Sequence, residues 1–490
     1  MNTIIAWARG LVTALAIALL TGGCQEFLDV NENPNAPETA RVDLRLPALI
    51  GGFGHALYYG DTQMWSAEWV QQYSFNRDTR PYAEVHRYEL QENDGTHAWN
   101  NFFATIMNEA RLIVEQTDPE TDPAYHGIAK FLLAWSWAHV TDMWGPVPFR
   151  DAFNPAIPDP QYDEQQAVYE AVHQMFEEAI ADMRREAPRV PSANDLLFSG
   201  DMARWAKLAR VVQARHHLRL AYAPGENSTD RAQKALVALQ EGFTSNADDA
   251  DFIYPGGEDA RNPLWTFREL VQFTASEFFV ELLRGHNDPR LPKMIEPAAW
   301  DSITGTVVWR AAPNTFRGHK NGSGQLTDST LSRIHGYYSN EAAPLNWASF
   351  ADTKFTEAEA RLIVSGAAAA DAPYRDGIRA HMQKLGVSPS DIDAYLASRP
   401  PLTAGNALEA IITEKYIANF LKVEPWNDWR RTGYPVLEIV EEAMLPGIPQ
   451  RIRTPGSELS NNAVNVRATG IDTGLEGMSV KVWWAEQGPG

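Results

Sequence analysis

The chain has 490 residues, of which 44% are hydrophobic, 21% charged and 11% aromatic. These are the proportions of a globular protein with a large core. The formal net charge of −21 argues against binding to nucleic acid or to anionic lipid headgroups. It is compatible with a neutral ligand, a cationic ligand or bound divalent cations. Most of the 16 tryptophans are expected in the core, where large aromatic side chains contribute most.

The first 23 residues have the layout of a secretory signal peptide. Arg9 supplies a positive charge, residues 11–20 form an apolar run too short to span a bilayer, and residues 21–23 are small. The next residue, Cys24, is the only cysteine. A cysteine at this junction is the residue that carries the acyl chains of a lipoprotein. We therefore predict that Cys24 is lipidated and that palmitate is among its acyl chains. Two or more acyl chains make such an anchor durable.

After the predicted leader, residues 24–40 are polar and rich in proline and asparagine, which predicts an extended tether. No later segment has 18 consecutive apolar residues. We therefore expect residues 41–490 to form a water-soluble body, held at a membrane by the lipid on Cys24.

Four segments of the body have the apolar periodicity of amphipathic helices. They are residues 125–144, 165–183, 208–222 and 408–420. Asp201 and Asn406 precede two of them as expected N-caps. Strand-like alternation is scarce, and residues 480–484 are its best case. The fold class predicted is mostly α.

Long stretches rich in glycine, proline and asparagine separate the helices. They cover residues 245–265, 284–350 and 440–478. Loops of this length carry function or pack as ordered excursions. Helix pairs with such insertions suggest stacked hairpins of tetratricopeptide type, although the sequence has no clean repeat of that length.

Motifs of catalysis or metal binding are not found. Glu357 and Glu359 are two residues apart and point to different faces of a helix, so they do not form a paired-carboxylate site. His216 and His217 diverge for the same reason, and the acids in residues 248–251 lack the spacing of a calcium loop. The sequence contains no Gly-rich phosphate loop, HExxH or GxSxG motif. We predict no enzyme activity, no cofactor and no metal.

Several blocks resemble the SusD/RagB family of outer-membrane nutrient-binding lipoproteins. They are residues 24–31 (CQEFLDVN), 141–149 (TDMWGPVPF), 354–360 (KFTEAEA), 374–378 (YRDGI), 414–418 (EKYIA), 424–435 (EPWNDWRRTGYP), 448–451 (IPQR) and 482–484 (VWW). Each block alone is weak, but their order behind a lipoprotein signal makes the resemblance strong. Residues 284–350 match nothing in the family.

The resemblance implies a single, mostly helical domain with tetratricopeptide-like helix hairpins and a loop-rich ligand-binding face. It also implies a surface-exposed nutrient-binding lipoprotein of the outer membrane. Such a protein captures oligosaccharides, or in some branches peptides, and hands them to a SusC-like TonB-dependent transporter. Arg430 and Arg431 are expected to be structural, because arginine suits bidentate pairing with carbonyls or acids.

Recognition of sugars requires flat aromatic faces beside amide, carboxylate and guanidinium groups. Three segments contain such clusters, and from them we predict ligand-binding residues. They are Tyr73, Asn76, Arg77, Tyr82, Trp99 and Asn100 in the first, Arg261, Asn262 and Trp265 in the second, and Trp309 and Tyr337 in the third. Trp65 and Trp69 are expected in the core.

Two alternatives remain open. An extracellular glycoside hydrolase would need two carboxylates converging about 5–10 Å apart, which the many acids in the long loops do not exclude. A purely structural lid of the transporter would bind no ligand. The acidic charge disfavours polyuronates, although a local basic patch of Arg77, Arg80 and Arg87 would reverse that at short range.

Overall fold

The structure is a computed structural model that describes residues 40–77, 82–258, 260–269, 273–301, 308–311, 315–326 and 330–489. The predicted leader, Cys24 and the tether up to residue 39 lie outside the described residues. The side chains of Tyr82 and Trp309 do as well. Within the described ranges, every helix is too short or too polar to traverse a bilayer.

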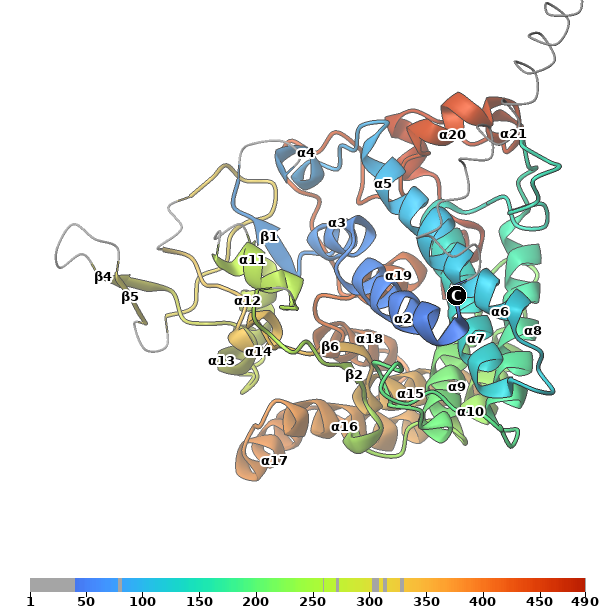
Figure 1. Cartoon of the computed structure of the whole chain (residues 1–490). Coiled ribbons are helices and arrows are strands. Elements are labelled where there is room, and N and C mark those ends of the chain that lie inside the picture. The colour runs from blue at the N-terminus through green and yellow to red at the C-terminus, as the bar shows by residue number, and fades with distance from the viewer. Residues whose placement is uncertain are drawn as a thin grey trace, which may run out of the picture.

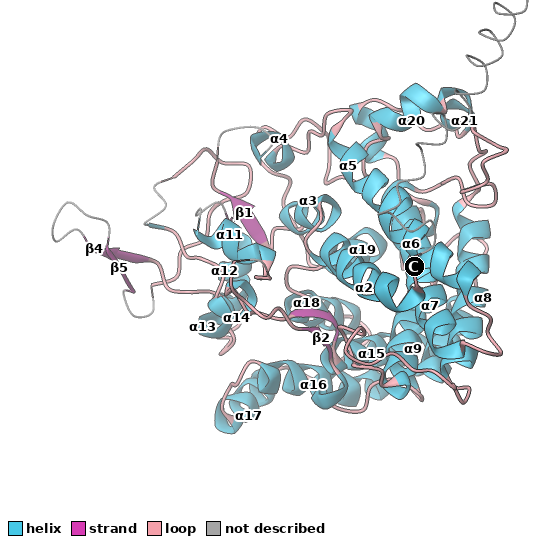
Figure 2. Ribbon diagram, viewed as in Figure 1, coloured by secondary structure: helices cyan, strands magenta, loops and turns pink. Residues whose placement is uncertain are grey.

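Helices dominate the chain, as the apolar periodicity predicts (Figure 2). The first part contains α2 (Val42–Tyr58), α3 (Asp61–Trp69), β1 (Tyr73–Phe75), α4 (Tyr82–His86), α5 (Asp94–Asn100), a π-helical segment (Asn101–Met107) and α6 (Asn108–Gln116). Four long helices follow, namely α7 (Pro123–Trp144), α8 (Gln165–Met183), α9 (Met202–Arg219) and α10 (Ser228–Leu239).

The middle of the chain consists of short elements. They are β2 (Ala250–Phe252), α11 (Pro263–Glu269), β3 (Phe273–Ala275), α12 (Glu277–Gly285), α13 (Leu291–Met294), β4 (Ala299–Asp301), β5 (Val308–Ala311), α14 (Gly336–Ser339) and β6 (Leu345–Ala348). The last part contains α15 (Phe350–Ser365), α16 (Ala367–Lys384), α17 (Pro389–Ser398), α18 (Ala407–Ala418), α19 (Glu424–Thr432), α20 (Gly456–Asn461) and α21 (Ala463–Ala468).

Consecutive long helices pack against one another as hairpins, as predicted. The pairs are α7 with α8, α9 with α10, and α15 with α16, and α10 also packs on α15. Figure 1 shows them together along the right and lower sides of the molecule. Three antiparallel strand pairs form: β1 with β3, β2 with β6, and β4 with β5. In Figure 1, β1, β4 and β5 lie to the left with α11 to α14, whereas β2 and β6 lie nearer the centre, beside α15 and α18.

Two of the predicted helix starts have different outcomes. The side chain of Asp201 accepts a hydrogen bond from the backbone N–H of Arg204 at 3.1 Å, which confirms it as the N-cap of α9. Asn406 precedes α18, but its side chain accepts from the Thr403 N–H at 2.7 Å and does not cap the helix.

The strand predicted at residues 480–484 is wrong. Trp483–Ala485 forms a 3₁₀ turn, and Trp484 is buried in a small cluster with Tyr169 and Leu220. The β-branched and aromatic side chains that favour a strand here fill a gap between α8 and the end of α9.

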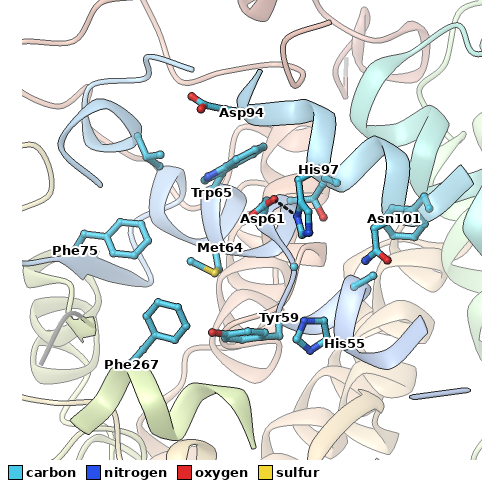
Figure 3. A pocket seen from close by; sticks show the side chains of 16 residues that line it. His55, Tyr59, Asp61, Met64, Trp65, Phe75, Asp94, His97, Asn101 and Phe267 are labelled. Atoms are coloured by element: carbon cyan, nitrogen blue, oxygen red, sulfur yellow. Dashed lines mark hydrogen bonds and ion pairs between the residues drawn. The ribbon is translucent and has the colours of Figure 1, made fainter. Parts of the chain in front are cut away.

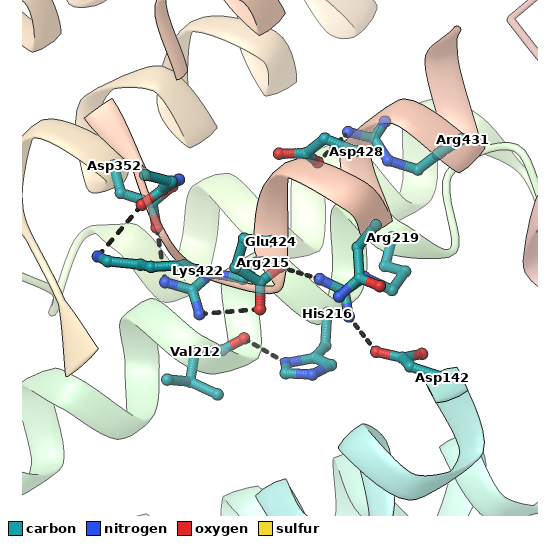
Figure 4. A network of polar contacts seen from close by, with 12 residues as sticks. Asp142, Val212, Arg215, His216, Arg219, Asp352, Lys422, Glu424, Asp428 and Arg431 are labelled. Carbon is teal, nitrogen blue, oxygen red and sulfur yellow. Dashed lines mark hydrogen bonds and ion pairs between the residues drawn. The ribbon is translucent and has the colours of Figure 1, made fainter. Parts of the chain in front are cut away.

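A network of buried charges joins the long helices (Figure 4). Arg215 of α9 donates to Asp352 of α15 at 2.7 Å and to Glu424 of α19 at 3.3 Å. One turn later, Arg219 bonds Glu424 and Asp142, the latter at the end of α7. These four helices come from distant parts of the sequence, and the paired charges fix how they meet. Breaking such a pair leaves an uncompensated buried charge, which is strongly destabilising.

The sequence motif around Arg430 and Arg431 belongs to the same scaffold, as predicted. Arg430 donates to the carbonyl oxygens of Asp142 at 2.8 Å and Gln450 at 2.9 Å. Arg431 donates to Asp428 and to the buried Glu359, each at 2.9 Å. These arginines therefore hold α19 against α7 and α15.

The other polar motifs also have structural partners. His216 lies against the Val212 carbonyl, with Nδ1 2.8 Å from its oxygen, whereas the His217 ring stacks on His173 with centroids 4.0 Å apart. Asp249 and Asp251 both accept hydrogen bonds from Lys384. Within the described ranges, no group of three or more histidine, cysteine or acidic residues is arranged to hold a metal ion.

Candidate functional site

A cleft of about 330 Å³ opens where α2 ends and α3 begins, facing α5 and α11. Figure 3 shows its lining, with His55, Tyr59 and Phe267 on one side and Met64, Trp65, Asp61 and His97 on the other. Phe75 of β1, Asp94 and Asn101 also line it. The volume lies within the usual range of ligand pockets, about 300–1,000 Å³.

The shape of the cleft depends on the junction between α2 and α3. Gly60 lies there, and a Cβ atom on it would come within 2.5 Å of the Ala56 carbonyl oxygen. Only glycine permits this close approach of the backbone. The tight junction places Tyr59 and Asp61, one residue to either side of Gly60, in the lining of the same cleft.

Aromatic and apolar side chains form most of the cleft wall. The ring of Tyr59 lies 5.4 Å from that of Phe267 and 5.0 Å from that of His55, between centroids. Trp65 is only 6% exposed, so it forms a fixed wall of the cleft. Planar rings held by neighbours are suited to contact the apolar face of a sugar ring or another flat ligand.

Four titratable side chains accompany these rings. The Nδ1 atom of His97 lies 3.0 Å from Oδ2 of Asp61. Asp94 accepts a hydrogen bond from the Gln91 N–H at 2.6 Å through one oxygen. Burial lowers the pKa of His55, and the nearby His97 lowers it further. His55 is therefore mostly uncharged at neutral pH, where it donates or accepts hydrogen bonds.

Other hollows differ in composition. A groove of about 640 Å³ along α8, α9 and α10 is lined mostly by charged and amide side chains. One of about 560 Å³ beside the end of α19 contains Trp429 and Tyr434. A cavity of about 60 Å³ contains Tyr337, but it is too small for a sugar ring. Compared with these three hollows, the cleft at the α2–α3 junction has the more aromatic lining and a volume suitable for a ligand.

Four of the predicted ligand residues lie in the protein interior, contrary to expectation. The Tyr73 hydroxyl donates to the Met64 carbonyl at 2.6 Å, and Trp99 stacks on Phe103 with centroids 4.4 Å apart. Asn76 exchanges hydrogen bonds with the backbone of Leu326, at 2.9 and 2.8 Å. Asn262 does the same with Ala343 and Leu264. Their amide and hydroxyl groups satisfy buried loop backbone, which explains polar residues among apolar ones.

The remaining predicted residues lie outside the cleft lining. Asn100 is exposed on α5, and Arg77 is half-buried after β1. The guanidinium of Arg261 lies over the Trp265 ring at 4.3 Å from its centroid. Tyr337 lines the small cavity. Trp65 and Trp69 are both buried in the core, as expected, and Trp65 also lines the cleft.

The sequence prediction missed His55, Tyr59, Asp61 and Phe267. The first three straddle Gly60 between two apolar helices, and Phe267 comes from a segment about 200 residues later. A glycine between an aromatic and an acidic residue at a helix junction was the one local signal available. Nothing local indicated that α11 closes the other side.

Comparison with known proteins agrees with the fold. A crystal structure of a SusD/RagB family protein from Bacteroides thetaiotaomicron is 21% identical and covers 92% of this chain and 100% of its own, with a TM-score of 0.75. A chitin-binding SusD homolog from Flavobacterium johnsoniae is 20% identical, with coverage of 90% and 98% and a TM-score of 0.76. A protein described as chitin-binding is 24% identical, with coverage of 91% and 100% and a TM-score of 0.76.

No curated protein matches the chain in sequence. A family model does match, over residues 48–455, which is well over half of the chain. The family is described as starch-binding and associating with the outer membrane. The match spans the helix hairpins, the buried charge network and the cleft, and the chain therefore belongs to the SusD-like family.

Proposed function

We propose that this protein is a lipoprotein on the outer face of the outer membrane that captures oligosaccharides and hands them to a SusC-like TonB-dependent transporter. The cleft at the α2–α3 junction is the proposed binding site, with Tyr59, Trp65 and Phe267 as its stacking surfaces. The observation that carries the proposal is the aromatic cleft in a chain of a carbohydrate-binding family. Two structural relatives described as chitin-binding support a glycan ligand.

Binding is tested by titration calorimetry of the full-length protein in detergent with starch and chitin oligosaccharides. Replacement of Tyr59 by alanine removes one stacking ring, and affinity should fall about tenfold. Trp429→Ala is the matched control, because Trp429 is also a half-buried aromatic residue but lies at the end of α19. Equal effects of both variants would contradict the proposed site.

Catalysis is the second candidate, and a chemical assay separates it from binding. The cleft lining contains the carboxylates of Asp61 and Asp94, so hydrolysis of a bound glycan requires a direct test. We expect no release of reducing ends when the protein is incubated with the oligosaccharides it binds. A release that disappears in Asp94→Asn would establish a hydrolase instead.

Anchoring and partnership are tested in cells. Cys24→Ala should move the protein from the membrane fraction to a soluble fraction, and mass spectrometry of the parent protein should find acyl chains on Cys24. Affinity purification of the anchored protein should recover a TonB-dependent transporter. A purely structural lid would recover the transporter without binding any glycan.

A further inference from the structure

The charges of the cleft suggest which glycans it accepts, an inference that rests on the proposed function. Among the described residues that line it, the carboxylates and imidazoles are those of Asp61, Asp94, His55 and His97. No lysine or arginine is among these lining residues. The local charge therefore has the same sign as the net charge of the whole chain.

Both carboxylates retain acceptor capacity. Oδ2 of Asp61 is the atom that faces His97, and Oδ2 of Asp94 is the atom that accepts from Gln91. Among the described residues, no hydrogen bond reaches the Oδ1 atom of either. An ionised carboxylate accepts about four hydrogen bonds, so each can accept further bonds from hydroxyl or amine groups of a ligand.

Nearby cations are engaged elsewhere. Arg268, next to Phe267 in α11, donates to Glu296 at 2.9 and 3.1 Å. Arg87 lies 3.9 Å from Glu442. Neither residue lines the cleft. Of the expected basic patch, Arg77 is also absent from the lining, and Arg80 lies outside the described residues. Arg77 and Arg87 therefore do not give the cleft a positive lining.

We infer that the cleft selects neutral and amine-bearing sugars and rejects glycans that carry carboxylate or sulfate groups. A ligand hydroxyl or ammonium donates a hydrogen bond to the carboxylate of Asp61 or Asp94. A uronate carboxylate placed at the same position meets a like charge, and no lysine or arginine among the described lining residues offsets it. Like-charge contacts of this kind are used for discrimination between ligands.

The experiment compares three tetrasaccharides of one β-1,4-linked backbone by calorimetry at low salt. The probes are the N-acetylglucosamine tetramer, the glucosamine tetramer and the glucose tetramer oxidised to uronate at C6. We expect the uronate to bind at least about tenfold more weakly than the neutral tetramer, the order given by one charge pair in a partly exposed site. The glucosamine tetramer should bind at least as tightly as the neutral one.

Two isosteric variants test the assigned residues. Asp61→Asn and Asp94→Asn should each reduce the difference in affinity between the uronate and the neutral tetramer. Both variants should also bind the glucosamine tetramer more weakly. Asp393→Asn is the charge-matched control, because Asp393 is exposed on α17 and bonds Arg379. That variant should leave the three affinities unchanged.

The outcomes separate this inference from the proposed function. Uronate binding as tight as neutral binding in the parent protein overturns the inference and leaves the proposed function intact. If Asp393→Asn reduces the difference in affinity as much as Asp61→Asn and Asp94→Asn do, the assignment of the discrimination to the cleft is overturned. Absence of binding by all three tetramers and by starch oligosaccharides overturns both.

Discussion

The charged side chains of the helical scaffold and those of the cleft differ in how completely they are paired. In the scaffold, Arg215 and Arg219 share Glu424, and each has a second carboxylate partner. In the cleft, the Oδ1 atoms of Asp61 and Asp94 receive no hydrogen bond from the described residues. Ion pairs of each arginine with two carboxylates fix how the packed helices meet, whereas the unused acceptor oxygens of the cleft are available to a ligand. The charge on a side chain therefore does not reveal its role, but its remaining hydrogen-bond capacity does.

The largest effect should come from breaking the scaffold network. Arg215→Ala removes the arginine partner of the buried Asp352 and leaves Glu424 with Arg219 alone. We expect a loss of about 3–5 kcal/mol in the free energy of unfolding. Urea denaturation measures this loss. Arg379→Ala, which removes an exposed partner of Asp393, should cost about 0–1 kcal/mol. A small loss in Arg215→Ala would show that the network is not a determinant of stability.

Acid should weaken the scaffold next. Burial lowers the pKa of His139 to about 3, whereas an unfolded histidine titrates near 6.5. Between these values the unfolded chain binds more protons, so stability is present above about pH 6.5 and is lost as the pH falls toward 3. Over this range, each such histidine lowers the free energy of unfolding by up to about 1.4 kcal/mol for each unit by which the pH falls.

Thermal unfolding at several pH values tests whether stability falls as the pH is lowered. The melting temperature should be steady above pH 7 and fall below about 6.5. His139→Gln should make that fall less steep, since the variant lacks one of the buried histidines whose pKa is lowered. An unchanged slope in His139→Gln would refute this account of the acid response.

A moderate effect is expected at the junction that shapes the cleft. In Gly60→Ala the new Cβ meets the Ala56 carbonyl oxygen, and relief of that contact must move α2 against α3. Overpacking of this kind costs about 1–3 kcal/mol, measurable by urea denaturation. Glycan affinity should fall as well. Gly447→Ala, a change with no atom within 4 Å of the new Cβ, controls for the loss of glycine itself.

The smallest effect on stability is expected for a charge in the cleft, in contrast to the charges of the scaffold. Asp61→Asn removes a charge that is part of an exposed pair with His97, so stability should change by no more than about 0.5 kcal/mol. The same substitution should alter the ranking of charged glycans. A stability loss as large as that of Arg215→Ala would mean that Asp61 is structural and not kept for a ligand.

The mostly helical fold followed from the sequence because helical periodicity is a local property. The segment 165–183 was predicted with the bounds that α8 has. Arg430 and Arg431 were correctly assigned to the scaffold from their chemistry. The strand predicted at residues 480–484 does not form, because a strand needs a neighbouring strand to pair with. Trp484 packs against Tyr169 and Leu220 of the helical scaffold instead.

The ligand residues were harder to predict. In the sequence, a polar or aromatic side chain that holds a loop in place cannot be distinguished from one that binds a ligand. Asn76 and Asn262 satisfy buried backbone groups, and Trp99 packs among other rings. Only the tertiary structure distinguishes these from Tyr59 and Asp61.

The sequence by itself determined the helical class, the family resemblance and the acidic charge, because these depend on composition, periodicity and ordered motifs. The tertiary structure decided which aromatic residues face a cleft and which charges remain partly unpaired. That decision depends on contacts between segments as distant as Tyr59 and Phe267, and no local pattern in the chain encodes such contacts.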